Sequence, residues 1–302
     1  MLNSAESVAA AARRAVAETA VTDVHTHLFP PSHDGLLLWG ADEILTYHYL
    51  VAELFTVAPA DLTPERFWSL PKPAQADLVW EHVFVKHGAL SEACRGAITT
   101  FNALGLDVAG RDLAGIRKWF AAQKADEYLA RVFEMAGIDY AVMTNNPFVP
   151  AEVDCWGRDL PRPECLKTAL RIDPLLVAWA DSARALAEQG YDVAPDGGGR
   201  TFDEVRRFLA DWTKRLGPVY FAASLGPEFA YPDESLRTQL IDRAIAPAAK
   251  DAGVPLALMM GVRKAVNPAL GDGGDGVGVA DCSALMGLLQ QHADAKFLVT
   301  ML

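Results

Sequence analysis

The feature that most constrains the fold of this chain is an alternation of short apolar runs with amphipathic segments over its second half. Strands that alternate with helices along a sequence indicate βαβ units and a parallel sheet, so we expect an α/β fold. The expected strands lie near residues 21–27, 140–144, 167–172, 219–224, 255–260 and 296–302. The expected helices of these units lie near residues 175–189, 202–216, 234–252 and 282–292.

The number of strands limits the architecture. A closed TIM-type (β/α)₈ barrel needs eight parallel strands, and about six are expected here. The last expected strand coincides with the end of the sequence, which would leave an unpaired apolar edge. We therefore expect a (β/α)₈ barrel of which about six strands are present, and we expect the chain to be truncated at its C-terminus.

The region between the first two expected strands has helical spacing almost throughout. We expect an N-terminal helix over residues 1–20, a barrel domain over 21–302, and within it a large helical insertion over 41–137. Asp42 is expected to cap a helix that runs through His48 to Val51. A helical region of this size also suggests a homo-oligomer contact, because its apolar faces need cover.

Composition excludes several classes of function. Of 302 residues, 51% are apolar and 22% charged, which is ordinary for a globular protein. A net charge of -12 would repel nucleic acid, so we expect no such partner. No apolar run is long enough for a membrane span, and four cysteines without a CxxC pair indicate reduced thiols and a cytoplasmic protein. The stretch 271–278 formally matches GxGxxG, but two aspartates there would repel a pyrophosphate, so we expect a rim loop.

Two histidines lie at the C-terminal end of the first expected strand, which we expect to be buried. His25 and His27 are two residues apart, so both imidazoles can point to the same side and face one ion. The C-terminal ends of barrel strands are where barrel enzymes place their chemistry. The alternative is a pair of surface histidines, but the apolar strand before them favours a metal site. Zinc normally takes three or four protein ligands, so a further ligand must come from elsewhere.

Other candidate residues are His48, Tyr49 and two arginines. A histidine beside a phenol offers a general acid or base and a hydrogen-bond donor to an oxyanion, although spacing alone favours an aromatic helix face in the core. Arg171 and Arg263 each follow an expected strand and suit bidentate capture of a carboxylate. The alternative for each arginine is a salt bridge on the barrel rim.

These motifs together resemble a known family. Asp23-Val24-His25-Thr26-His27-Leu28, with His48-Tyr49 about twenty residues later, resembles the opening of the uronate isomerases. These are barrel enzymes of the amidohydrolase superfamily that interconvert glucuronate or galacturonate with a ketose acid. Three later segments are similar to family motifs in the same order: Thr144-Asn145-Asn146-Pro147, Leu170-Arg171-Ile172-Asp173-Pro174 and Gly261-Val262-Arg263.

The resemblance implies a function and roles for these residues. It implies a hexuronate isomerase, an intramolecular oxidoreductase whose partner is a small sugar acid. His25 and His27 would bind a divalent metal ion, for which we expect Zn²⁺. His48, Tyr49 and Arg171 would be catalytic, and Arg171 with Arg263 would bind the substrate.

The chain also departs from the family pattern, as a divergent member would. Met259 and Met260 stand where a histidine is usual, and Asn145 and Asn146 stand where acids are common. The family's third metal ligand is an aspartate on the last barrel strand, beyond the residues given. Two alternatives follow: a lactonase-like metal-dependent hydrolase of the same superfamily, and a catalytically inactive fragment or sugar-acid-binding scaffold.

Overall fold

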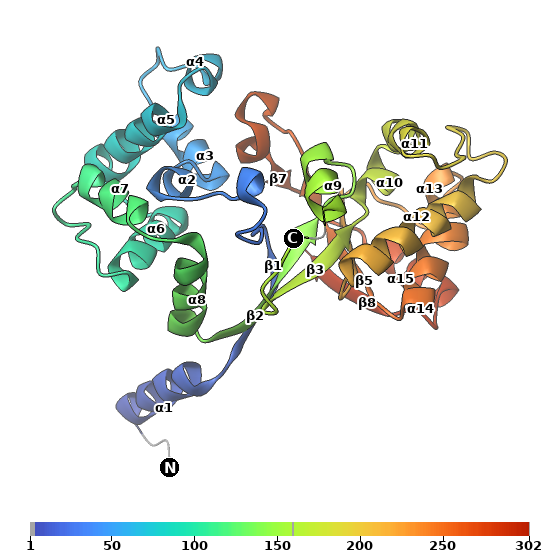
Figure 1. Ribbon diagram of the computed structural model, residues 1–302, viewed down its shortest axis with the longest axis horizontal. Coiled ribbons are helices and arrows are strands. Elements are labelled where there is room, and N and C mark those ends of the chain that lie inside the picture. The colour runs from blue at the N-terminus through green and yellow to red at the C-terminus, as the bar shows by residue number, and fades with distance from the viewer. Residues whose placement is uncertain (1–3, 159, 302) are drawn as a thin grey trace.

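A curled sheet of parallel strands forms the centre of the molecule (Figure 1). The computed structural model describes residues 4–158 and 160–301. Six strands pair in the order β1-β2-β3-β4-β5-β8, every pair parallel, so the six expected strands are confirmed up to Met301, and Leu302 lies outside the described residues. Their bounds are β1 Val21–Thr26, β2 Ile138–Asn145, β3 Leu166–Arg171, β4 Phe221–Leu225, β5 Leu256–Met260 and β8 Phe297–Met301.

Helices connect these strands as the alternation predicted. One helix, α15, precedes β8, and the others follow β2, β3 and β4. Two expected helices are interrupted: 175–189 breaks at Ala178, and 234–252 contains a π-helical turn. The bounds are α9 Pro150–Gly157, α10 Asp173–Val177, α11 Trp179–Glu188, α12 Thr201–Leu216, α13 Leu236–Leu240, η3 Ile241–Ile245, α14 Ala246–Ala252 and α15 Cys282–Gln291.

Helix α12 shows how these helices cover the sheet. Its apolar side chains recur three or four residues apart, which places them on one face. That face buries Phe208 and Trp212 in a core shared with Phe221 of β4 and Leu258 of β5. Gly217 ends the helix in the left-handed conformation that glycine adopts without strain.

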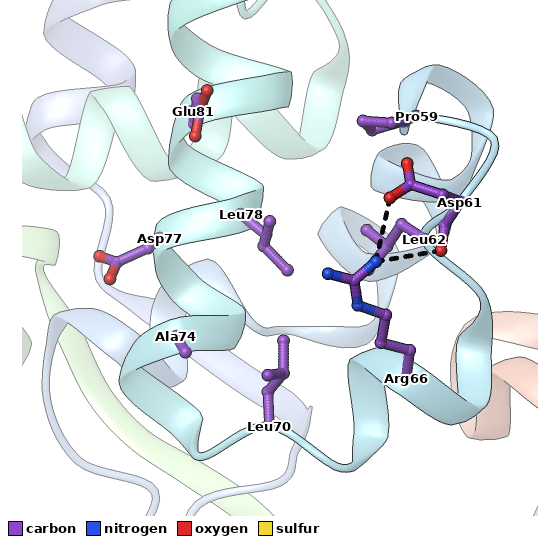
Figure 2. A pocket seen from close by; sticks show the side chains of 9 residues that line it. All are labelled: Pro59, Asp61, Leu62, Arg66, Leu70, Ala74, Asp77, Leu78 and Glu81. Carbon is purple, nitrogen blue, oxygen red and sulfur yellow. Dashed lines mark hydrogen bonds and ion pairs between the residues drawn. The ribbon is translucent and has the colours of Figure 1, made fainter.

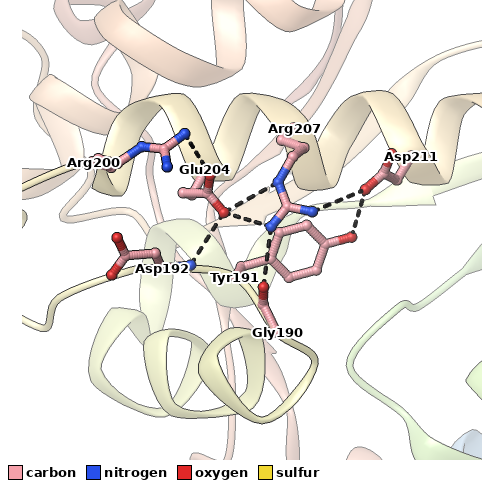
Figure 3. Close-up of polar contacts among 7 residues, drawn as sticks. All are labelled: Gly190, Tyr191, Asp192, Arg200, Glu204, Arg207 and Asp211. Carbon is pink, nitrogen blue, oxygen red and sulfur yellow. Dashed lines mark hydrogen bonds and ion pairs between the residues drawn. The ribbon is translucent and has the colours of Figure 1, made fainter.

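A polar network fixes the loop between α11 and α12 (Figure 3). Arg207 of α12 donates to Glu204 from Nε at 3.1 Å, and its guanidinium lies 4.3 Å from the ring centroid of Tyr191. The hydroxyl of Tyr191 donates in turn to Asp211 at 2.9 Å. The charged side chains of Glu204, Arg207 and Asp211 all have protein partners, so we assign the network a structural role.

The chain between β1 and β2 forms a group of helices with a core of its own. Buried side chains of this core include Leu54, Phe67, Phe101 and Phe120. Helix α1 (Ala5–Glu18), before β1, buries none of its residues and projects from the rest of the molecule (Figure 1). The helices between β1 and β2 are η1 Asp34–Leu36, α2 Ala41–Leu45, α3 His48–Val57, α4 Pro64–Trp68, α5 Lys72–Val79, η2 Trp80–Lys86, α6 Glu92–Ala103, α7 Leu113–Ala121 and α8 Ala125–Ala136.

The helix expected to run from Asp42 to Val51 is two helices. Gly40 precedes α2, and Asp42 is not its cap but pairs with Arg117 through Nε at 2.7 Å. The chain leaves the helical conformation at Tyr47, whose ψ of 139° is extended, and α3 then begins at His48. The prediction of one capped helix is therefore wrong, and His48 and Tyr49 lie in the first turn of α3.

The segment after β5 forms the expected loop at the edge of the sheet. Strands β6 (Val262–Arg263) and β7 (Gly276–Val277) pair antiparallel and enclose the 3₁₀ segment η4 (Pro268–Gly274). The indole of Trp68 in α4 donates to the carbonyl of Ala269 at 2.8 Å. An added Cβ on Gly273 would lie only 2.8 Å from the carbonyl oxygen of His48. The loop therefore packs closely against the start of α3.

Two further expectations concern the environment of the chain. None of the helices in the described residues is both long and apolar enough to cross a membrane. All four cysteines are free, which agrees with reduced thiols.

Candidate active site

The two histidines of the predicted metal pair lie at the C-terminal end of β1. Their ring centroids are 5.2 Å apart and the ring planes are nearly perpendicular. Both side chains are exposed at their surface, yet partial desolvation by the surrounding strand ends is the main cause that lowers the pKa of both imidazoles, and the positive charge of Arg171 lowers both further. Both side chains therefore favour the neutral form, which is the form that binds metal ions. The expectation of a buried strand is wrong, because β1 pairs only with β2 among the described strands and none of its residues is buried.

A threonine from the neighbouring strand holds His27. The Oγ1 atom of Thr144, near the end of β2, lies 3.1 Å from Nδ1 of His27 and 3.2 Å from the carbonyl oxygen of Thr26. A carbonyl only accepts, so the hydroxyl donates to Thr26 and accepts from the Nδ1–H of His27. This arrangement leaves Nε2 of His27 unprotonated and available to a ligand.

His48 and Tyr49 lie close to this pair. The ring centroids of His48 and Tyr49 are 4.2 Å apart. The positive charge of His48 lowers the pKa of His27. Tyr49 is 59% exposed, so it does not belong to an aromatic face packed in the core. The first turn of α3 thus presents an imidazole and a phenol beside the end of β1.

Arg171 is the last residue of β3 and is fixed by a carboxylate. Its Nε donates to Oδ2 of Asp173 at 3.1 Å, and Oδ1 of Asp173 accepts the backbone N–H of Ser224 in β4 at 2.7 Å. The side chain of Arg171 is 24% exposed and that of Asp173 only 6%. The arginine therefore reaches the surface of the site while its anchor is buried.

A second buried carboxyl lies behind the end of β2. Oε2 of Glu152 in α9 accepts the backbone N–H of Asn146 at 2.9 Å. Burial raises the pKa of Glu152 to about 7, and the Asn146 amide and Arg171 oppose that rise. The amide of Asn145 is buried as well, and its two polar atoms have no hydrogen-bond partner among the described residues.

The loop after β5 adds an acidic side chain and places the second predicted arginine. The carboxylate of Asp272 in η4 raises the pKa of both His27 and His48, against the lowering by burial. Nε of Arg263 lies 2.7 Å from the Cβ position that Gly278 lacks, so this arginine packs over its own hairpin. Among the described residues, no hydrogen bond or ion pair joins Arg263 to His25, His27 or Arg171.

Three of these residues were not singled out for the site by the sequence pattern. Asp272 belongs to the rim loop, where the sequence pattern indicates only a charge that would repel a pyrophosphate. Asp173 and Glu152 lie in segments next to an expected strand end, but their partners come from distant parts of the chain. The only sequence signal for them is their place just after β3 and β2, where carboxyl ends of parallel strands gather.

The donor atoms fit part of a metal site. His25 and His27 supply two neutral imidazoles, which suit a divalent ion such as Zn²⁺. In the part of the chain that the structure describes, no group of three or more His, Cys, Asp or Glu side chains could hold a metal ion. The pair would therefore provide two of the three or four protein ligands that such an ion takes.

Two pockets of the molecule lie away from these strand ends. One of about 280 Å³ opens between α4 and α5 and is lined by Arg66, Leu70 and Leu78 (Figure 2). Its Asp61 is paired with Arg66 at 3.0 Å, and another pocket of about 400 Å³ lies at Trp80 and Phe84. Neither is lined by a predicted site residue. We therefore place the chemistry at the strand ends, where the polar groups converge.

Comparisons with known proteins identify relatives among solved structures. No protein-family model and no curated protein matches the chain. A uronate isomerase from Bacillus halodurans is 43% identical, with a TM-score of 0.95 over 100% of this chain and 71% of that one. Two further solved structures share the fold. A uronate isomerase from Thermotoga maritima is 12% identical, with a TM-score of 0.59 over 96% of this chain and 72% of that one. A glucuronate isomerase from Caulobacter crescentus is 15% identical, with a TM-score of 0.60 over 92% of this chain and 66% of that one.

Proposed function

The chain belongs to the uronate isomerase family, and from this premise we propose that it converts a hexuronate, such as glucuronate or galacturonate, into the corresponding ketose acid. The observation that carries the proposal is the 43% identity over the whole chain to a uronate isomerase. The gathering of His27, His48 and Arg171 at one edge of the sheet supports it. A hydrolase finds no comparable support.

The reaction requires a group that holds the carboxylate of the sugar acid, and Arg171 suits that role. Its Nε is engaged by Asp173, and no hydrogen bond within the described residues occupies the other end of the guanidinium. A guanidinium can bind a carboxylate through two parallel hydrogen bonds. We assign Arg171 to the substrate carboxylate. Arg263 stays a proposed second contact, from the hairpin next to the site.

Isomerisation also moves a proton between neighbouring oxygen-bearing carbons of the sugar. Tyr49 offers an exposed phenol that can donate a hydrogen bond to the oxygen on which negative charge develops. His48, whose pKa is lowered mainly by burial, favours the neutral form that can take up a proton. We propose that Tyr49 stabilises the oxygen and that His48 relays the proton.

A divalent ion, for which we propose Zn²⁺, would be held by His25 and His27. When bound, such an ion supplies a Lewis acid that polarises the hydroxyl and carbonyl oxygens of the sugar. The bond between Thr144 and Nδ1 of His27 supports this assignment, because metal-binding histidines are usually oriented by a partner on their other nitrogen.

The finer architecture is part of the proposal. We propose that residues 21–302 form one domain of the (β/α)₈ type, with 41–137 as a helical insertion and 1–20 as a separate helix. The order of the parallel strands and the separate core of the helices between β1 and β2 support this division. A homo-oligomer contact through the helical region stays a prediction.

The test compares two substrate classes on one preparation of metal-loaded protein. We expect glucuronate or galacturonate to yield a ketose, and elemental analysis to find about one divalent ion per chain. Release of acid from a sugar lactone, without ketose from any hexuronate, would instead identify a hydrolase. Binding of hexuronates without turnover would identify a sugar-acid-binding scaffold and contradict the proposal.

A further inference from the structure

Asp173 connects the ends of two neighbouring strands. It lies two residues after Arg171, in the first turn of α10, and is 4% exposed. Each of its carboxylate oxygens has a different partner: Oδ2 accepts from Nε of Arg171, and Oδ1 accepts from the backbone N–H of Ser224. The carboxylate therefore joins the side chain at the end of β3 to the backbone of β4.

The backbone of β4 fixes where this carboxylate lies. Arg171 is paired with Ala222 in the parallel ladder, and Ile172 N–H donates to the Ala222 carbonyl at 2.8 Å. The next N–H on that side, from Ser224, goes to Asp173 in place of a β3 carbonyl. A short, partly buried hydrogen bond to the backbone of β4 leaves the carboxylate little freedom, so it is a fixed acceptor for Arg171.

A fixed acceptor at Nε determines the direction of the guanidinium. A free arginine side chain loses rotamer entropy when it is immobilised, and a prior hydrogen bond removes much of that loss on binding. With Nε engaged, the far edge of the guanidinium is presented in one orientation. The negative charge of Asp173 also offsets the positive charge of Arg171 beside His25, whose pKa the carboxylate raises and the arginine lowers.

We propose that Asp173 is the positioning residue for Arg171, and that it holds the guanidinium in the orientation that receives the carboxylate of a hexuronate. The inference rests on the proposed function, because it assigns Arg171 to that carboxylate. Asp173 itself does not touch the substrate.

The test is a double-mutant cycle of Asp173→Asn with Arg171→Ala. Asparagine keeps an oxygen for the Ser224 N–H but offers an NH₂ group, which cannot accept from Arg171. We expect Asp173→Asn alone to lower kcat/KM for the hexuronate roughly 10- to 100-fold, mainly through KM, which is the effect of losing one charge-assisted hydrogen bond. In the Arg171→Ala background the same change should cost less than about threefold.

Asp181→Asn is the matched control, because Asp181 makes an exposed pair with Arg184 at 3.0 Å on α11. It should leave kcat/KM unchanged. Equal losses from Asp173→Asn in both backgrounds would show a merely structural role and overturn the inference alone. If the wild type converts the hexuronate and Arg171→Ala has the same kcat/KM, the role of Arg171 is overturned, and with it that of Asp173.

Calorimetry measures the affinity of the same four proteins for the hexuronate and so repeats the double-mutant cycle without turnover. If the protein binds but does not convert the sugar acid, the isomerase proposal fails. The positioning role of Asp173 is still supported if Asp173→Asn weakens binding in the wild type but not in the Arg171→Ala background. A protein that neither binds nor converts any hexuronate overturns both.

Discussion

Glu152 shows how strongly burial changes a single side chain near the site. It is 6% exposed, and burial raises its pKa to about 7 although Arg171 and the Asn146 amide favour the charged form. Because the folded pKa exceeds the ordinary value of 4.5, the folded state retains a proton that the unfolded chain releases between these values. The contribution of Glu152 to stability is therefore complete below about pH 4.5 and is lost as the pH rises through about 7.

We predict that Glu152→Gln reduces the pH dependence of stability. In the wild type, the titration of Glu152 should lower the free energy of unfolding by up to about 3 kcal/mol between about pH 5 and pH 8. Urea unfolding of both proteins at the two pH values measures the difference. Glu164→Gln, at an exposed position, is the control and should follow the wild type. Identical pH dependence in the Glu152 variant would show that this carboxyl does not titrate in the predicted range.

At the scale of single residues, the sequence predicts some site groups and misses others for a physical reason. His25, His27 and Arg171 are predictable because they follow apolar strands, and parallel strands bring their carboxyl ends to one edge. The roles of Thr144 and Asp173 are not predictable in this way. Thr144 meets His27 across 117 residues of sequence, and Asp173 meets Ser224 across 51. Such contacts depend on strand register, which no local pattern contains.

Among the elements, α3 and the loop after β5 have the most direct bearing on the site. Apolar spacing predicted one helix through Thr46 and Tyr47, but the structure breaks there. Thr46 and Tyr47 are poor helix formers, and the Thr46 hydroxyl donates to the carbonyl of Asp42 at 2.7 Å. The break places His48 and Tyr49 at the start of α3. There they pack against the loop after β5, which is more than 200 residues away in sequence.

We predict that Gly273→Ala displaces the start of α3 and lowers kcat for the hexuronate. The added Cβ would lie 2.8 Å from the carbonyl oxygen of His48, so either η4 or the first turn of α3 must move. A displacement of about 1 Å at a catalytic group costs on the order of 100-fold. Steady-state kinetics and circular dichroism measure activity and fold.

Gly96→Ala provides the matched control for that variant. Gly96 lies in α6 with no atom within 4 Å of an added Cβ, so alanine there should stabilise the protein slightly and leave kcat unchanged. Wild-type kcat in Gly273→Ala would mean that the loop does not position His48 and Tyr49.

For the whole molecule, the sequence predicts the class of the fold better than the arrangement of its parts. Short apolar runs that alternate with amphipathic segments predict the six parallel strands and the helices between them. They do not predict that β1 would be exposed, because exposure depends on the neighbours of a strand and not on its own pattern. Nor do they predict that the helices before β2 form a core separate from that of the sheet.

The central claim is that the ends of β1 and β3 and the start of α3 form one site for a hexuronate. The most direct test is kcat/KM for the same hexuronate in His27→Ala, Tyr49→Phe and Arg171→Ala, beside Asp181→Asn. We predict that each of the three variants loses at least about 100-fold while its fold is retained, and that the control matches the wild type. Wild-type kcat/KM in any of the three would contradict the claim that its segment belongs to the site.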